Sequence, residues 1–278
     1  MKVKNTIRVS PNLFLITLFL SLLIFSSSAL SETCPAGTSL TLFAGTDPNG
    51  QVLVFNGVNQ WPISYDSTEQ TIWSLGGYSV NNHLYAGSFS GGKIFDYDGC
   101  AWSLSYDSPE QDIKAIEEYN GKLYASSGIS GKVHVYDGST WKLAFDPTDV
   151  DDSYGYSLKV YNGKLYYGTG WKGGTIYVYD GSTWSVAYNT LTEGVFSLQV
   201  YNGKLYAGTI TNGKIYSFDG SSWVLEKALN VGYAVHSLEV YGNELYASTA
   251  PDGIVYVLRD GNWIVTLDTS YPSVIPLK

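Results

Sequence analysis

Six similar segments, each about 40 residues long, follow one another along this chain and restrict its fold more than any other feature. A tryptophan marks the same place in every copy, after a Tyr-Asp pair or a variant of it. These slot tryptophans are Trp61, Trp102, Trp141, Trp184, Trp223 and Trp263, separated by 41, 39, 43, 39 and 40 residues. Chance does not space a rare residue this evenly, so the chain is a repeat protein with six copies.

Each copy predicts four short β-strands. In the fifth copy, strands are expected at 196–201, 204–208 and 214–218, and a fourth strand carries Trp223. The runs are rich in Tyr, Val and Ile and are bounded by turn residues, which is typical of strands. Asn-Gly and Asp-Gly pairs lie between the first and second and between the third and fourth strands. Both dipeptides are typical of two-residue hairpins.

The repeat predicts an all-β fold, a six-bladed β-propeller of four-stranded antiparallel blades. A single sheet of this size leaves both faces open, whereas a ring of sheets buries them against each other. The first copy begins at its second strand, residues 40–44, with no Asn-Gly hairpin before it. We therefore expect the C-terminal segment, 270–278, to pair into the first blade through Val274 to Leu277 and close the ring.

Residues 1–31 are typical of a cleavable export signal. Lys2, Lys4 and Arg8 give a positive start, an apolar run follows at 13–25, and small residues occupy 26–31. We expect a mature propeller at 32–278 that is secreted or held at the cell surface. A retained anchor and a lipid on Cys34 are the alternatives, but the apolar run is short of the roughly 20 residues that a membrane span needs.

Charge excludes some partners. Without residues 1–31, the chain has 13 Lys and Arg against 25 Asp and Glu, a net charge of −12. Phosphate binding needs a basic patch, so nucleic acid and anionic membrane are not expected partners. We expect a protein or a glycan instead, and the sequence does not determine the oligomeric state.

The order of strand, turn, Leu-Tyr, loop and Tyr-Asp-x-x-x-Trp resembles the kelch repeat and the related propeller of galactose oxidase. The matching positions are the Tyr-Asp pairs that begin at Tyr97, Tyr136 and Tyr179, together with the slot tryptophans, and the resemblance covers residues 37–270. It implies a propeller of kelch type. The period is shorter than the roughly 50 residues of kelch repeats, and their double glycine is not kept.

The loops that differ between copies share one face of the predicted disc, which we call the variable face. Loops on a rigid scaffold commonly carry function, so we expect a ligand site there. Trp171, beside Lys172, stands in one of these loops, where an exposed ring can stack on a sugar or anchor a protein. Phe89, Tyr154 and Tyr156 are the other candidates. The alternatives are that Trp171 folds over its own blade and that the loops vary without function.

Two groups of acidic residues also lie on the variable face. Asp146, Asp149, Asp151 and Asp152 bring together oxygen ligands of the kind that hold Ca²⁺, although solvated surface acids are the alternative. Asp66, Glu69, Asp107, Glu110 and Asp112 lie in equivalent links after the first two copies. We expect this second group to make one side of the face acidic and to favour cationic partners.

Cys34 and Cys100 are the two cysteines of the chain. Cys100 replaces the serine of an Asp-Gly-Ser turn, and Cys34 precedes the segment where the chain enters from the same face. An exported protein occupies an oxidising compartment, so we predict a Cys34–Cys100 disulfide. Two free thiols are the alternative.

The sequence contains no recognisable catalytic machinery. Asp-Gly-Ser-Thr-Trp is similar to the Asp-box of sialidases, but those enzymes need three arginines and the mature chain has Arg259 alone. His83, His134 and His236 fall at a turn, a third strand and a first strand, and no P-loop, nucleophile elbow or zinc motif occurs. We expect a non-catalytic binding module without a cofactor. The alternatives are a polysaccharide hydrolase or lyase that uses carboxylates and a structural cell-surface module.

Overall fold

The computed structural model describes residues 19–21, 43–55, 60–147, 153–171, 173–190, 193–229 and 234–268. The regular structure in these ranges is β-strand throughout, arranged as six four-stranded antiparallel sheets. This confirms the all-β fold and the four strands expected of each copy. No helix in the described ranges is long and apolar enough to cross a membrane.

The first three sheets follow the chain in order. The first contains β1 (Phe19–Ser21), β2 (Phe43–Gly45), β3 (Gln51–Val54) and β4 (Ile63–Asp66). The second contains β5 (Thr71–Tyr78), β6 (His83–Phe89), β7 (Lys93–Tyr97) and β8 (Trp102–Asp107). The third contains β9 (Ala115–Tyr119), β10 (Lys122–Ser126), β11 (Val133–Tyr136) and β12 (Trp141–Phe145).

The other three sheets repeat this order. The fourth contains β13 (Gly155–Tyr161), β14 (Lys164–Thr169), β15 (Thr175–Tyr179) and β16 (Trp184–Asn189). The fifth contains β17 (Val195–Tyr201), β18 (Lys204–Thr209), β19 (Lys214–Phe218) and β20 (Trp223–Ala228). The sixth contains β21 (Ala234–Tyr241), β22 (Glu244–Ala250), β23 (Ile254–Arg259) and β24 (Asn262–Asp268).

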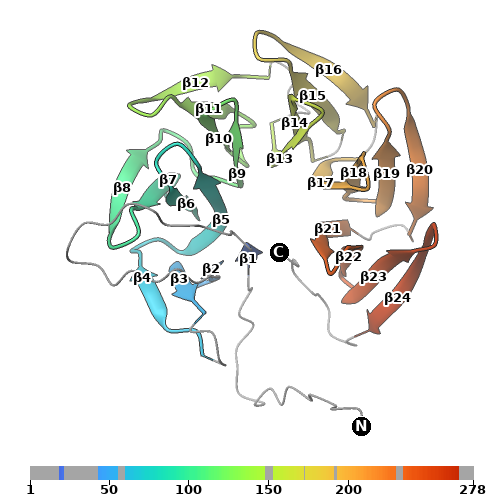
Figure 1. The fold of residues 1–278 in the computed structure, drawn as a ribbon, viewed down its shortest axis with the longest axis horizontal. Coiled ribbons are helices and arrows are strands. Elements are labelled where there is room, and N and C mark those ends of the chain that lie inside the picture. The colour runs from blue at the N-terminus through green and yellow to red at the C-terminus, as the bar shows by residue number, and fades with distance from the viewer. Residues whose placement is uncertain are drawn as a thin grey trace.

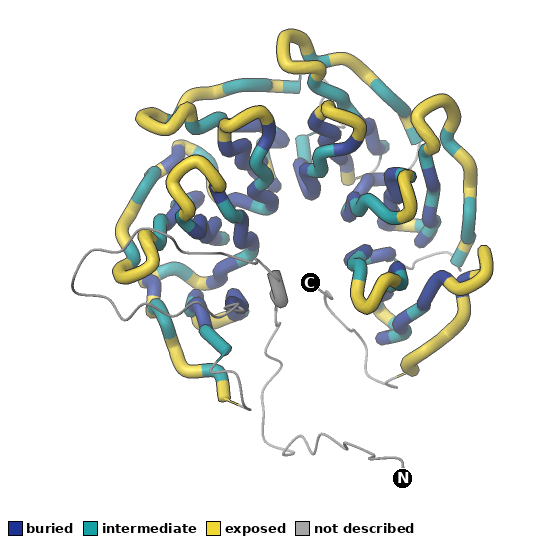
Figure 2. Tube along the Cα trace, in the orientation of Figure 1, coloured by how far each residue is buried: buried dark blue, intermediate teal, exposed yellow. Residues whose placement is uncertain are grey.

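The sheets are the blades of a propeller. Figure 1 shows them arranged around a common centre, with the first strand of each blade innermost and the last strand outermost. Burial follows the same order: the inner strands are mostly buried, whereas the outer strands and the turns are exposed (Figure 2). The six inner strands therefore surround the axis, where a cavity can form.

The first blade differs from the prediction at its inner edge. There β1 pairs antiparallel with β2, with Leu20 opposite Ala44, so the inner position belongs to a strand from the predicted export signal. Residues 270–278, which we expected in this position, lie outside the described residues. The backbone N–H and C=O groups at the edge of β2 can pair with any extended segment, so the repeat pattern alone does not decide which end of the chain fills the place.

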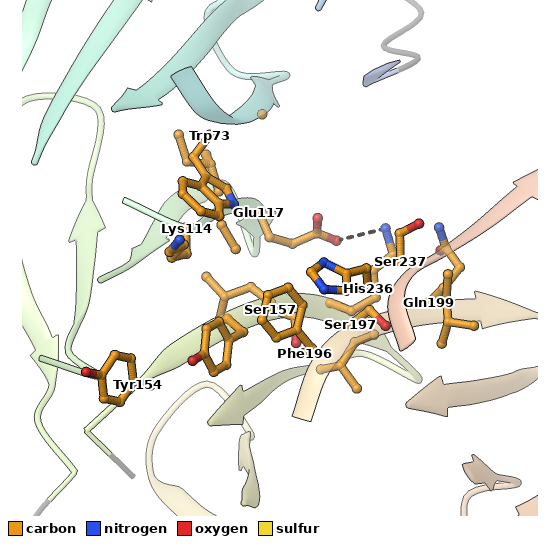
Figure 3. Close-up of a pocket in the computed structure, with 18 of the residues that line it drawn as sticks. Trp73, Lys114, Glu117, Tyr154, Ser157, Phe196, Ser197, Gln199, His236 and Ser237 are labelled. Atoms are coloured by element: carbon orange, nitrogen blue, oxygen red, sulfur yellow. Dashed lines mark ion pairs between the residues drawn. The ribbon is translucent and has the colours of Figure 1, made fainter. Parts of the chain in front are cut away.

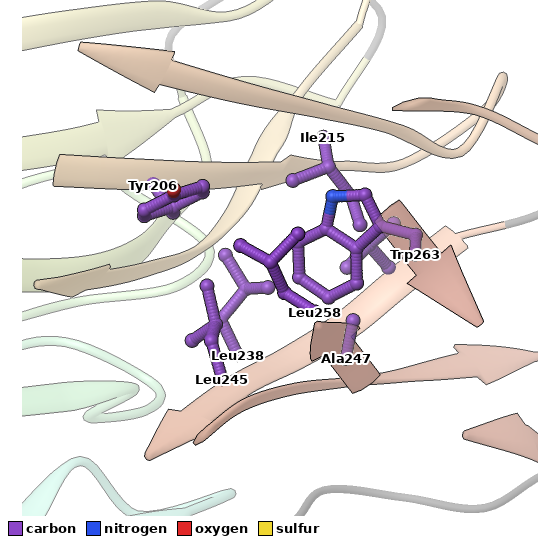
Figure 4. Close-up of a cluster of buried hydrophobic side chains, with 8 residues drawn as sticks. Tyr206, Ile215, Leu238, Leu245, Ala247, Leu258 and Trp263 are labelled. Carbon is purple, nitrogen blue, oxygen red and sulfur yellow. The ribbon is translucent and has the colours of Figure 1, made fainter. Parts of the chain in front are cut away.

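The hydrophobic cores lie between blades. Each cluster of buried side chains takes members from two neighbouring sheets. Figure 4 shows one such cluster between the fifth and sixth blades, formed by Tyr206, Ile215, Val235, Leu238, Leu245, Ala247, Leu258 and Trp263. Four equivalent clusters join the other successive blades. A blade thus buries its faces only against its neighbours, as a ring of repeats requires.

The slot tryptophans pack across these boundaries. Trp184 stacks on Tyr179 of its own blade at a centroid distance of 4.9 Å. Its other face meets Phe145 of the preceding blade at 4.7 Å, with the ring planes 18° apart. Trp102, Trp141 and Trp223 repeat the same sandwich. Each of these tryptophans therefore contributes to the contact between two blades.

The turns follow the prediction in part. Asn120 and Gly121 both have positive φ, as a two-residue hairpin requires. The prediction is wrong for most Asp-Gly turns, which have four residues between paired strands. In the turn after β7, the carboxylate of Asp98 accepts hydrogen bonds from the amides of Cys100 and Ala101, both at 2.8 Å. These bonds satisfy the additional amides and stabilise the longer turn.

Candidate functional site

A cavity of about 1000 Å³ opens at the centre of the propeller. The inner strands of the second to sixth blades, β5, β9, β13, β17 and β21, supply most of its wall (Figures 1 and 3). Loops of the variable face complete its mouth. The cavity therefore lies where side chains from five repeats meet.

Five equivalent residues form a ring at the mouth of the cavity, which we call the mouth ring. Each stands five positions before the tyrosine that ends its inner strand. The mouth ring consists of Trp73, Lys114, Tyr156, Phe196 and His236. Three are aromatic and two are basic, so the same place in the repeat carries different chemistry in each blade.

A bulge in the inner strand accompanies most of these residues. The strand register shifts between Ile72 and Ser74 around Trp73, and equivalent shifts occur at Tyr156, Phe196 and His236. A β-bulge leaves one residue unpaired and changes the direction of its side chain. The bulges therefore distinguish the mouth ring from the alternating pattern of the rest of each strand.

A second ring lies deeper in the cavity, three residues further along each inner strand, and we call it the polar ring. Its members are Glu117, Lys159, Gln199 and Glu239, and Gly76 occupies the equivalent position in the second blade. Lys159 pairs with Glu117 at 3.7 Å, and the amide of Gln199 donates to Glu239 at 3.1 Å. The cavity is therefore aromatic at its mouth and polar inside.

Aromatic rings continue around the mouth in an unbroken arc. Trp171 lies 5.7 Å from Tyr154, which lies 6.1 Å from Tyr156, measured between ring centroids. Tyr156 stacks on Phe196 at 4.4 Å, and Phe196 lies 4.8 Å from His236. At the other end of the arc Trp171 is 53% exposed, so its ring is open to a ligand.

Of the five ligand residues that the sequence predicts, Trp171, Phe89, Tyr154 and Tyr156 line this cavity. Lys172 lies outside the described residues. The structure thus brings four of them to one place, and their role in binding stays a prediction.

Sequence reasoning missed the rest of the mouth ring. Trp73, Lys114, Phe196 and His236 are not among the ligand residues that the sequence predicts. A usable signal existed, because aligning the copies on the strand-end tyrosine places these residues in one column. The bulges at Trp73, Phe196 and His236 leave no comparable mark in the sequence.

Lys114 is the main charged group at the mouth. Its ammonium lies 2.6 Å from the centroid of the Trp73 ring and 5.4 Å from that of Phe89 (Figure 3). The nearest carboxylate oxygen paired with it, Oδ2 of Asp112, is 4.0 Å away. Burial lowers the pKa of Lys114 to about 7, although the negative charges of Asp112 and Asp47 oppose the shift. Burial and the charge of Lys114 also lower the pKa of His236.

Two buried polar groups beside Lys114 have unused hydrogen-bonding capacity. Asp112 is completely buried; its Oδ1 accepts a bond of 3.0 Å from the amide of Ile129, and its Oδ2 has no hydrogen-bond partner in the described part of the chain. The hydroxyl of Tyr156 also has none there, and burial raises the pKa of this phenol. A buried polar atom without a partner is costly, so both groups can gain from a bound ligand.

The acidic links carry less free charge than the sequence suggests. Glu69 pairs with Lys93 at 2.7 Å, and Glu110 pairs with Lys132 at 3.7 Å. Glu193 pairs in the same way with Lys214 in the fifth blade. A lysine before or at the start of the third strand thus neutralises the preceding link in three blades, which weakens the expected attraction for cationic partners.

The other predicted sites are only partly within the described residues. Asp146 is exposed, whereas Asp149, Asp151 and Asp152 lie outside these residues. No group of three or more His, Cys, Asp or Glu able to hold a metal occurs in the described ranges. Cys100 is disulfide-bonded, and Cys34 also lies outside the described residues, so the predicted calcium site and the Cys34–Cys100 pairing stay predictions.

Comparison with protein-family models finds no match, and comparison with curated proteins finds none either. Solved structures do match. A catalytically inactive virginiamycin B lyase from Staphylococcus aureus, solved with quinupristin, has a TM-score of 0.70 and 14% identity over 92% of this chain and 88% of its own. The extracellular domain of a putative one-component system from B. thetaiotaomicron has a TM-score of 0.67 and 15% identity over 93% of this chain and 34% of its own.

A nidogen/laminin complex also contains a similar chain, with a TM-score of 0.58 and 14% identity over 81% of this chain and 91% of the other. These identities are too low to transfer a function, and fold alone does not imply one. The matches show that the protein has a β-propeller fold.

Proposed function

We propose that the protein is an exported, non-catalytic binding module that holds a glycan at the mouth of its central cavity. The aromatic arc from Trp171 to Phe196 is the observation that carries this proposal. Sugar rings present flat apolar faces, which stack on aromatic side chains, and hydroxyl groups, which need polar partners. The arc supplies the first kind of contact.

The polar groups beside the arc support the same ligand class. A sugar hydroxyl can donate to Oδ2 of Asp112, which has no hydrogen-bond partner in the described part of the chain. The deeper polar ring offers Glu117, Gln199 and Glu239. A folded protein partner commonly covers about 800 Å² of a broad surface. The end of a glycan chain is small enough to enter a concave site. The cavity therefore favours a glycan over a protein surface.

An extracytoplasmic location is part of the proposal. The support is the sequence of residues 1–31 and the similarity to extracellular domains. We further propose cleavage of the signal, the kelch-type relationship and a Cys34–Cys100 disulfide. Mass spectrometry of a non-reduced digest tests the disulfide: a cross-linked peptide containing both cysteines is expected, and Cys100 joined to any other thiol contradicts it.

A glycan array probed with the mature protein, residues 32–278, tests the function. Binding to a defined set of glycans is expected, and adding calcium or a chelator shows whether the Asp146–Asp152 cluster contributes. An array that is blank under both conditions contradicts the proposal and favours a protein partner or a structural role.

A further inference from the structure

Among the described residues, Lys114 is the one lysine of the cavity mouth, and its surroundings differ from those of the other described lysines. Its side chain is 9% exposed and lies over the face of Trp73. Lys159, which lines the same cavity, is 29% exposed and pairs with Glu117 at 3.7 Å. Lys93 and Lys214 donate hydrogen bonds to Glu69 and Glu193, and these bonds raise the pKa of each lysine. In the described part of the chain, the nearest carboxylate paired with Lys114 is Asp112, at 4.0 Å.

We propose that Lys114 is a reactive amine that captures a small aldehyde or ketone as an imine inside the cavity. This activity goes beyond glycan binding and does not depend on it. The carbonyl compound reaches the nitrogen through the mouth, where Trp73, Phe89 and Tyr156 offer an apolar wall to the rest of the molecule.

The reaction needs no redox partner. The lone pair of the Lys114 nitrogen attacks the carbonyl carbon, a C–N bond forms, and the electron pair of the C=O π bond moves to oxygen. The nitrogen then loses its two protons in turn and the oxygen gains two, so the oxygen leaves as water and a C=N bond results. Oδ2 of Asp112, 4.0 Å from the nitrogen, can take each proton from nitrogen and pass it to the oxygen.

Electrostatics support a neutral nucleophile. Burial disfavours the ammonium most strongly, and the charge of His236, which faces it from β21, would oppose it as well. Asp112 and Asp47 favour the ammonium, as do the aromatic faces of Trp73 and Phe89. The resulting pKa of about 7 leaves a large fraction of the amine uncharged at neutral pH, whereas an ordinary lysine with a pKa of about 10.4 is almost fully protonated. Desolvation in an apolar pocket is a known way to activate a lysine for imine formation.

Reductive trapping tests the proposal. The mature protein is incubated with pyridoxal and sodium cyanoborohydride between pH 6 and pH 9, and the labelled peptides are quantified. At pH 7.5 we expect Lys114 to be labelled at least about tenfold faster than Lys159, with a rate that rises around pH 7. Equal rates at the two residues, or a rate at Lys114 that does not rise until pH 9, would overturn the proposal.

Two variants complete the test. Lys114→Arg keeps a long basic side chain over Trp73 but has no reactive amine. The label at this position must therefore disappear while the fold is retained. Tyr241→Ala, which changes an exposed residue outside the cavity lining, must leave the labelling of Lys114 unchanged. Selective labelling with a blank glycan array contradicts only the proposed function, whereas glycan binding without selective labelling contradicts only this inference.

Discussion

The hydroxyl of Tyr119 donates a hydrogen bond of 3.0 Å to the carbonyl oxygen of Gly163, in the Asn-Gly turn of the next blade. The same bond joins Tyr78 to Gly121, Tyr161 to Gly203 and Tyr201 to Asn243. The tyrosine that ends an inner strand therefore fastens one blade to the turn of its neighbour. Tyr241, at the end of the last inner strand, is 75% exposed, and the sequence between β1 and β2 contains no Asn-Gly pair.

Removing one of these bonds should weaken the propeller slightly. Tyr119→Phe deletes the donor and keeps the ring, and we expect the free energy of unfolding to fall by about 1 kcal/mol. Chemical denaturation measures the change. Tyr241→Phe is the matched control and should have no measurable effect; equal losses in the two variants would show that the bond between blades contributes nothing.

The tryptophan sandwiches should matter much more. Trp184→Ala removes a ring stacked between Phe145 and Tyr179, and we expect a loss of about 3 kcal/mol, as for other large-to-small substitutions of packed aromatics. Trp171→Ala removes the same side chain from an exposed loop and should change stability by less than about 0.5 kcal/mol. Similar losses for both would contradict the assignment of the slot tryptophans to inter-blade packing.

Closure of the ring can be tested after the signal is removed. In a mature protein that begins at residue 32, β1 is gone and the inner edge of β2 needs another partner. We predict that residues 270–278 pair there, so truncation after residue 269 should lower the melting temperature and expose the amides of β2 to hydrogen exchange. Unchanged melting and exchange would mean that the tail does not close the ring.

Lys114 should make stability depend on pH. Its folded pKa of about 7 lies below the value of about 10.4 in an unfolded chain, so between these values the unfolded state binds more protons. The free energy of unfolding should therefore rise from pH 7 to pH 9, by up to about 1.4 kcal/mol per pH unit from this group. In Lys114→Met the rise should be smaller, and parallel curves for the two proteins would contradict a buried, titrating Lys114.

The sequence predicts most of the fold, because a propeller repeats its packing. The spacing of the tryptophans predicts the number of blades and the length of each. In the structure these tryptophans stack on aromatic rings of two neighbouring blades. It does not predict the longer turn at Asp98, where a carboxylate satisfies two amides, nor the use of β1 at the inner edge of β2. Both outcomes depend on local backbone hydrogen bonds, which the repeat pattern does not specify.

The candidate site is partly predictable. Trp171 stands out in the sequence as a loop tryptophan, and Tyr154 is predicted with it because both residues lie in loops of the variable face. Phe196 belongs to β17 and Lys114 immediately precedes β9, and both residues are conspicuous only once the blades are placed around an axis. The lowered pKa of Lys114 arises from burial, and the rings that cover it, Trp73 and Phe89, are distant from it in the sequence.

The most direct test of the account is a titration of the mature protein and two variants with the strongest glycan from the array. Trp171→Ala should bind at least about tenfold more weakly than the unchanged protein, a loss of about 1.4 kcal/mol, because a stacking platform at the cavity mouth is removed. Tyr241→Ala, which removes an exposed aromatic ring on the opposite face, should bind with the original affinity. If Trp171→Ala binds normally, or Tyr241→Ala loses affinity, the glycan does not bind at the mouth of the central cavity.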